Sequence, residues 1–225
     1  LGYTFLTEYD RTKWLAHYRV ALPLIDQGVP IIIVMPGAVY GPGDPSLVGD
    51  MMRYFYKGLF PILPGPELTL TYAHVEDIVE GHILVAEKGR IGESYLLTGP
   101  ALSNGEAVKL WAQVSGKRAP YLNIPARLVK PLAPLADLLN TLFSLPILSR
   151  DSVVILDATY IASSAKARQE LGWQPRSPEE GFRQTFEHIA QTTRPINLLP
   201  ETPKQRRTLA GFALSAGIGL LLVWL

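Results

Sequence analysis

A tyrosine and a lysine four residues apart are the side chains of this sequence best suited to acid–base chemistry. Tyr9 and Lys13 form the only Tyr-x-x-x-Lys pattern in the chain. Residues at positions i and i+4 of a helix lie on the same face. An ammonium group within about 4–6 Å favours the ionised phenol and lowers its pKa from about 10. A shift to about 7 requires roughly 4 kcal/mol, of which one lysine supplies a part. This spacing would suit a tyrosine that exchanges a proton near neutral pH.

The same pair also has an ordinary structural interpretation as two solvated side chains on a helix. Ten Tyr and eight Lys in 225 residues give about 0.4 such pairs by chance, so the spacing alone does not identify a catalytic pair. The surrounding elements have to decide between the two interpretations.

These elements predict an α/β fold. Residues 9–27 show helical periodicity and are stopped by Gly28 and Pro30. The apolar run 31–35 is typical of a parallel strand buried on both faces, and a loop rich in Gly and Pro follows at 36–44. Further helices are expected at about 46–57, 74–88, 103–116, 163–171 and 177–192, and strands at 68–72 and 93–98.

Several motifs follow the Tyr–Lys helix in a fixed order: Pro36-Gly-Ala-Val-Tyr-Gly-Pro-Gly-Asp44, Tyr72-Ala-His-Val-Glu-Asp77, Gly89-Arg-Ile-Gly-Glu-Ser-Tyr95, Glu170-Leu-Gly-Trp173, Pro175-Arg-Ser177 and Glu180-Gly181. Over residues 9–190 this order resembles the C-terminal half of the extended short-chain dehydrogenases/reductases, the NAD-dependent epimerase/dehydratase family. The dihydroflavonol-reductase-like and sterol-dehydrogenase-like members are the most similar. The resemblance implies the C-terminal part of a Rossmann-type doubly wound parallel sheet, a smaller α/β substrate lobe and a C-terminal hydrophobic helix.

The resemblance also implies roles for individual residues. Tyr9 is expected to be the general acid–base, and Lys13 to hold the nicotinamide ribose of NAD or NADP while lowering the pKa of the tyrosine. Pro36, Gly37 and Val39 are expected to line the nicotinamide, although turn chemistry alone also accounts for Pro36 and Gly37. His74 and Asp77 match the family's His-Val-x-Asp, and we interpret both mainly as structural residues, with a substrate role for His74 as the alternative.

Other parts of the family pattern have no counterpart in this sequence. They include the Gly-rich turn that seats the cofactor pyrophosphate, the residue that selects NAD or NADP, and the Ser or Thr that polarises the substrate carbonyl. Gly41-Pro-Gly43-x-x-Ser46 follows a strand, but Pro42 has no N–H to offer a phosphate, so we reject it as a dinucleotide site. Since the chain starts at Leu1, we expect an upstream part, without which cofactor binding is not expected.

The predicted domain organisation has three parts. Residues 1–118 are expected to form the C-terminal half of the dinucleotide-binding domain with interleaved substrate-lobe segments, and residues 119–199 the substrate lobe. Residues 200–225 combine a linker, a basic cluster and an uncharged apolar run at 209–225. That run is at the short limit for a membrane span, and the alternative is a helix docked on the domain. The basic cluster would place the globular part on the cytoplasmic side of a membrane.

Composition excludes several classes of protein. The net charge of +1 gives no basic field for nucleic acid, and the absence of Cys excludes thiolate zinc sites and a cysteine nucleophile. The four His residues lack the HExxH type of spacing, so no metal site is expected.

We therefore expect an NAD(P)-dependent oxidoreductase that acts on a secondary alcohol or ketone of a small molecule. If the chain is anchored in a membrane, we expect this substrate to be lipophilic. A homodimer is compatible with the resemblance. Two alternatives stay open: a nucleotide-sugar epimerase or dehydratase with the same Tyr–Lys pair, and a non-catalytic membrane-bound scaffold with the same fold.

Overall fold

The computed structural model of this chain describes residues 4–133 and 150–193. The chain divides into two compact units. The first contains Leu1–Gly41, Leu70–Ala101 and Tyr160–Gly181, and the second contains Pro42–Thr69, Leu102–Thr159 and Phe182–Leu225. This division differs from the predicted contiguous lobe 119–199, because residues 160–181 pack within the first unit, where Leu171 and Trp173 join its hydrophobic core.

The first unit begins with one continuous helical run, as the sequence predicts. It comprises α1 (Glu8–Leu15), a π-helical segment η1 (Ala16–Ala21) and α2 (Leu22–Asp26). Thr7 caps α1, and its hydroxyl and backbone N–H both engage the carboxylate of Asp10 in a capping box. In the part of the chain that the structure describes, none of the residues of this run is buried.

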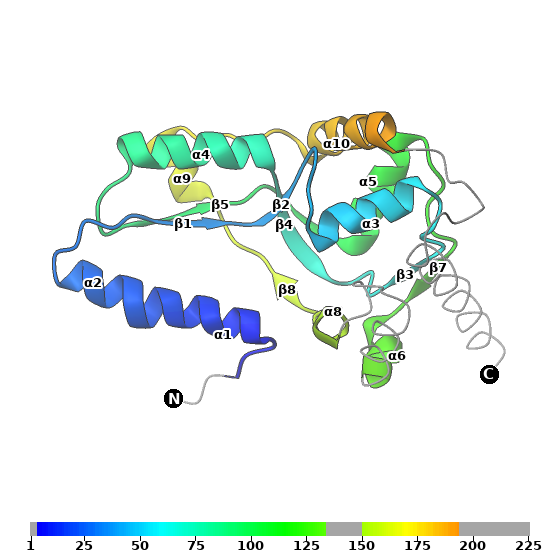
Figure 1. Ribbon diagram of the computed structural model, residues 1–225, viewed down its shortest axis with the longest axis horizontal. Coiled ribbons are helices and arrows are strands. Elements are labelled where there is room, and N and C mark those ends of the chain that lie inside the picture. Colours follow the sequence, from blue (N-terminus) through cyan, green and yellow to red (C-terminus); the bar gives the residue numbers. More distant parts are fainter. Residues whose placement is uncertain (1–3, 134–149, 194–225) are drawn as a thin grey trace. The chain divides into compact units, whose positions relative to one another are not determined.

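A parallel strand pair lies beside this helical run in the first unit. β1 (Ile33–Pro36) pairs with β5 (Ser94–Leu97), with Ile33 opposite Ser94. Helices α4 (Val75–Lys88) and α9 (Ala165–Leu171) lie on the other side of these strands from the α1–α2 run (Figure 1). Tyr95 and Leu97 of β5 are fully buried in the core that forms between the strands and these two helices.

Strand β1 is only half-buried, although its apolar run predicted a strand buried on both faces. Within residues 4–133 and 150–193, β5 is its sole strand partner, and the α1–α2 run contributes no buried residue. The residues at 31–35 are therefore more apolar than the half-buried position of β1 in the described residues requires.

A second sheet contains β2 (Ala38–Tyr40), β4 (Thr69–His74) and β6 (Ala101–Ser103) in that order, and β8 (Thr159–Tyr160) also pairs with β4. Strands β2 and β4 are parallel, with Ala38 opposite Tyr72. The parallel pairs and the helices between them confirm the predicted α/β class.

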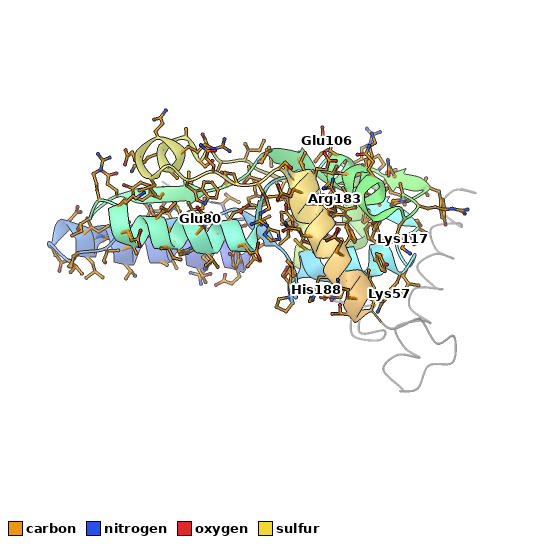
Figure 2. All side chains as sticks on the ribbon, turned by 90° about the horizontal axis from the view of Figure 1, so that it is seen from above. Lys57, Glu80, Glu106, Lys117, Arg183 and His188 are labelled. Carbon is orange, nitrogen blue, oxygen red and sulfur yellow. The ribbon has the colours of Figure 1, made fainter. Side chains whose placement is uncertain are left out.

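The second unit packs three helices around an aromatic core. These are α3 (Leu47–Tyr56), α5 (Asn104–Ser115) and the part of α10 (Pro178–Thr192) that follows Gly181. The indole of Trp111 makes edge contacts with the rings of Phe55, Phe182 and Phe186. Figure 2 labels Arg183 and His188 along α10, and Lys57 at the end of α3, where Tyr56 stacks on Phe186.

Shorter elements complete this second unit. Strand β3 (Ile62–Pro64) pairs in parallel with β7 (Leu122–Ile124). The remaining elements are α6 (Ala126–Val129), the 3₁₀ helix η2 (Lys130–Leu132) and α8 (Arg150–Val154).

Two predictions about the C-terminal region fall outside the described residues. The linker and apolar run at 200–225 are not among them, nor are residues 134–149 and 194–199 of the predicted substrate lobe. Within the described residues, no helix combines the length and the apolar character that crossing a bilayer requires.

Candidate functional site

The predicted acid–base pair lies on the first two turns of α1. Thr12 donates a hydrogen bond from its hydroxyl to the Tyr9 carbonyl, and the Lys13 ammonium lies 5.4 Å from the centre of the Tyr9 ring. The two side chains therefore share one face, as their spacing predicts. Tyr9 is 67% exposed, which leaves its hydroxyl accessible to a ligand. No carboxylate among the described residues pairs with Lys13, so its ammonium can donate to hydroxyl groups of a bound molecule.

Chain direction brings this pair toward the carboxyl end of β1. The α1–α2 run leads back into β1, so the helix and the strand run in opposite directions and the first turn of α1 lies toward the Pro36 end of the strand (Figure 1). Ligands of open parallel sheets bind outside the carboxyl ends of the strands. The first turn of α1, which contains Tyr9, therefore lies toward the end of the strand where ligands of such sheets bind (Figure 1).

Pro36 and Gly37 form the end of β1 and the step into β2. Pro36 is exposed, and the Gly37 N–H donates to the Leu97 carbonyl on β5. A Cβ at position 37 would lie closer than 3.0 Å to the main-chain oxygen of Thr71, a separation that real Cβ atoms essentially never show. Glycine is thus needed here for close approach of two backbones, which is a structural requirement whether or not a cofactor binds.

Val39 lies opposite Ala73 in the β2–β4 pair, and its side chain packs against the hydrophobic core of the first unit. The Val39 side chain is only partly buried by this packing. The candidate residues are thus an exposed proline beside a glycine, and an exposed phenol on a helix whose Lys13 ammonium lies 5.4 Å from the centre of the phenol ring.

A pocket of about 340 Å³ opens in the first unit beside these strands. Its polar side chains are those of Thr71, Ser163, Ser164 and Arg168, and its apolar wall includes Ile161. The Arg168 Nε donates to the Ser164 hydroxyl at 3.2 Å. Sequence reasoning did not single out these residues. Ser163, Ser164 and Arg168 lie in the region expected as the helix 163–171, but no local spacing indicates that they share a pocket with Thr71.

The region 41–46, rejected above as a dinucleotide site, contains a carboxylate where a phosphate would have to bind. Ser46 caps α3 by accepting from the Val48 N–H, and the Asp44 carboxylate accepts from the Ser46 N–H at 2.7 Å. A carboxylate beside the first turn of this helix repels a phosphate.

The motifs around Asp77 and Trp173 meet in the interior of the first unit. Asp77 accepts from the Arg176 Nε at 2.9 Å and from the Arg176 backbone N–H at 3.0 Å. The Trp173 indole N–H donates to the Asp77 carbonyl at 2.7 Å. These contacts explain why the two motifs occur together, and they give Asp77 the structural role that the sequence predicts.

His74 is buried at the start of α4 and has a capping role. Its Nδ1 accepts from the Glu76 N–H at 3.4 Å, and its ring meets the edge of Tyr40 with the ring centres 5.6 Å apart. Burial, followed by the positive charge of Arg176, lowers the pKa of His74. Burial, followed by the negative charge of Asp77, raises the pKa of Tyr40. Both groups are therefore held in their neutral forms.

Comparisons with known proteins identify the family of this chain. A family model described as the NAD dependent epimerase/dehydratase family matches residues 3–97. The chain is 32% identical over 189 residues to the sterol demethylase protein B of Methylococcus capsulatus, covering 78% of this chain and 54% of that protein. It is 31% identical over 187 residues to human short-chain dehydrogenase/reductase family 42E member 1, covering 74% of this chain and 47% of that protein. The chain belongs to the NAD-dependent epimerase/dehydratase family of extended short-chain dehydrogenases/reductases.

The chain spans about half the length of the curated relatives it matches. Among solved structures, a nucleoside-diphosphate-sugar epimerase from Pseudomonas aeruginosa is similar with a TM-score of 0.67 and 23% identity, covering 85% of this chain and 59% of that one. That likeness confirms the predicted Rossmann-type fold.

Proposed function

We propose that the full-length protein containing this chain is an NAD(P)-dependent oxidoreductase that interconverts a secondary alcohol and a ketone. The observation that carries the proposal is the exposed Tyr9–Lys13 pair on a helix whose first turn lies toward the carboxyl end of β1. The family is NAD-dependent by its description.

Each residue of the pair has a distinct part in the proposed chemistry. When bound, the nicotinamide supplies or accepts the hydride. Tyr9 gives its hydroxyl proton to the carbonyl oxygen during reduction, and takes a proton from the alcohol during oxidation. Lys13, whose ammonium lies 5.4 Å from the centre of the Tyr9 ring, would donate hydrogen bonds to the ribose hydroxyls of the bound cofactor. Pro36 and the main chain of Gly37 and Val39 border the nicotinamide.

A lipophilic substrate of the sterol type fits this protein better than a nucleotide sugar. The relatives above 30% identity include a protein named for sterol demethylation. The likeness to a sugar-nucleotide epimerase at 23% identity concerns the fold alone. An epimerase or dehydratase with the same Tyr–Lys pair is the second candidate, and a non-catalytic scaffold is the third.

Replacing Tyr9 by Phe in the full-length protein tests the chemistry. We expect turnover of a sterol-alcohol panel to fall by about 10²-fold or more, while cofactor binding, followed by nicotinamide fluorescence, persists. Tyr18→Phe is the matched control, since Tyr18 lies on the same helical run and is 51% exposed. Unchanged turnover of Tyr9→Phe would remove this residue from the chemistry. Conversion without net change in NAD(P)H would identify an epimerase, and a wild-type protein without turnover on alcohols, ketones or sugar nucleotides would support the scaffold.

The apolar run 209–225 has a proposed role of its own as a membrane anchor, with the globular part on the cytoplasmic side. Its support is the uncharged sequence that follows Lys204, Arg206 and Arg207. We expect the full-length protein to sediment with membranes after carbonate washing, and a truncation before Lys204 to stay in the supernatant. Equal recovery of both forms in the supernatant would contradict anchoring.

A further inference from the structure

The helix that carries Tyr9 is held at its first turn by polar contacts rather than by burial. The α1–α2 run has no buried residue within the described parts of the chain. Apolar packing, which usually fixes a helix in a fold, therefore contributes little at this end. The local geometry depends on the capping box, in which Asp10 Oδ2 accepts from the Thr7 N–H at 3.2 Å and from the Thr7 hydroxyl at 2.9 Å.

A third donor reaches the same carboxylate oxygen from a segment 150 residues away. The Tyr160 hydroxyl lies 3.4 Å from Asp10 Oδ2. Tyr160 ends β8, and this strand pairs with β4. Burial, followed by the charge of Asp10 and this hydrogen bond, raises the pKa of Tyr160, so its phenol keeps its proton and acts as the donor. The contact is longer than the range of about 2.5–3.0 Å usual for O–H···O hydrogen bonds, so a shift of a few tenths of an ångström in either partner strengthens or breaks it.

We propose that Tyr160 is a positioning residue for the reaction, because its hydroxyl fixes through Asp10 the first helical turn on which Tyr9 lies. This inference rests on the proposed function of Tyr9. Asp10 is the next residue after Tyr9, and its carboxylate joins the helix cap to β8. A bond that restrains Asp10 therefore restrains the direction in which the Tyr9 hydroxyl points.

The residues that follow Tyr160 line the pocket of the first unit. Residues 161–165 line the 340 Å³ pocket together with Thr71 and Arg168. Tyr160 thus connects the wall of that pocket to the helix of the acid–base pair. The Tyr160 ring is 37% exposed and the Ile161 side chain is 59% exposed, so this connection lies on an accessible face of the first unit.

The test is a pair of conservative variants in the full-length enzyme. Tyr160→Phe removes the hydroxyl and keeps the ring, and Asp10→Asn removes the charge while keeping an oxygen that can cap the helix. We expect each variant to lower kcat by about three- to tenfold, the rate equivalent of one hydrogen bond, with little change in the KM for the cofactor. The double variant should lose no more than the larger single loss, because Tyr160→Phe removes the same contact that Asp10→Asn weakens by removing the charge.

Tyr121→Phe is the matched control, since Tyr121 is 72% exposed and we expect its kcat to be unchanged. Circular dichroism melting separates misfolding from mispositioning, because an exposed hydrogen bond contributes little to global stability. A kcat of Tyr160→Phe equal to the wild-type value, or effects that multiply in the double variant, would overturn the inference. If those results accompany a large loss in Tyr9→Phe, the proposed function stands and the positioning role alone fails.

Discussion

Replacing Asp77 by Asn should destabilise the first unit by about 2–3 kcal/mol. Asp77 is 4% exposed, and its two carboxylate oxygens accept from the side chain and the backbone of Arg176. Removing one partner of a buried ion pair costs about 3–5 kcal/mol, because the other charge stays buried. The cost is smaller here, since the Arg176 side chain is 18% exposed and also pairs with Glu76 at 2.9 Å.

Unfolding in guanidinium measures the free energy of unfolding of Asp77→Asn and of the wild type. Hydrogen exchange of the amides in the first turn of α4 then shows whether the loss of stability is located there. Glu76→Gln is the matched control, since it removes the other carboxylate that pairs with Arg176. The Glu76 side chain is 65% exposed, and an exposed pair contributes about 0–1 kcal/mol. A loss below about 1 kcal/mol for Asp77→Asn, or a loss equal to that of Glu76→Gln, would refute the assignment of Asp77 as the buried anchor of Arg176.

Two further changes test the site and its surroundings. Gly37→Ala should destabilise the protein by about 1–3 kcal/mol, measured as a lower melting temperature, because its Cβ would meet the Thr71 main-chain oxygen. Because of His74, the free energy of unfolding should decrease as the pH is lowered. The folded pKa of His74 is lowered, so its contribution is complete above the unfolded value of about 6.5 and is lost as the pH falls from there toward the folded pKa. The free energy of unfolding measured from pH 7.5 down to about 5 checks this, with His74→Asn as a variant that caps without titrating.

The predictions for Gly37 and His74 each have a control and a result that would contradict them. Gly105→Ala serves as the control for Gly37→Ala, since a Cβ at position 105 meets its nearest neighbour at 3.5 Å and position 105 lies inside α5. Equal melting temperatures for the two alanine variants would show that the backbones at Gly37 can separate freely. An acid slope that is identical in His74→Asn and the wild type would assign the pH dependence to other groups.

Helix boundaries could be predicted closely because their signals are local. The helix expected at about 103–116 is α5, which begins at Asn104 after a capping box between Ser103 and Glu106. The expected helix at 74–88 is α4, capped by His74. Side-chain caps and Gly stops act within one turn of the chain, so a short window of sequence contains the whole cause.

Short strands were not predictable in the same way. Strands β2, β3, β6, β7 and β8 have two or three residues each, too few for a periodicity to appear. Their existence depends on a partner strand that lies elsewhere in the chain.

The sequence alone determined the α/β class, the family and the shared helical face of Tyr9 and Lys13, because each depends on spacing within a few residues or on motifs in a fixed order. Tertiary structure decided that Tyr160 reaches Asp10 and that Arg176 pairs with Asp77, contacts that span 150 and 99 residues. It also decided that Gly37 is required by the Thr71 backbone. Such contacts arise when distant segments fold against one another, and no local pattern encodes where a second segment will lie.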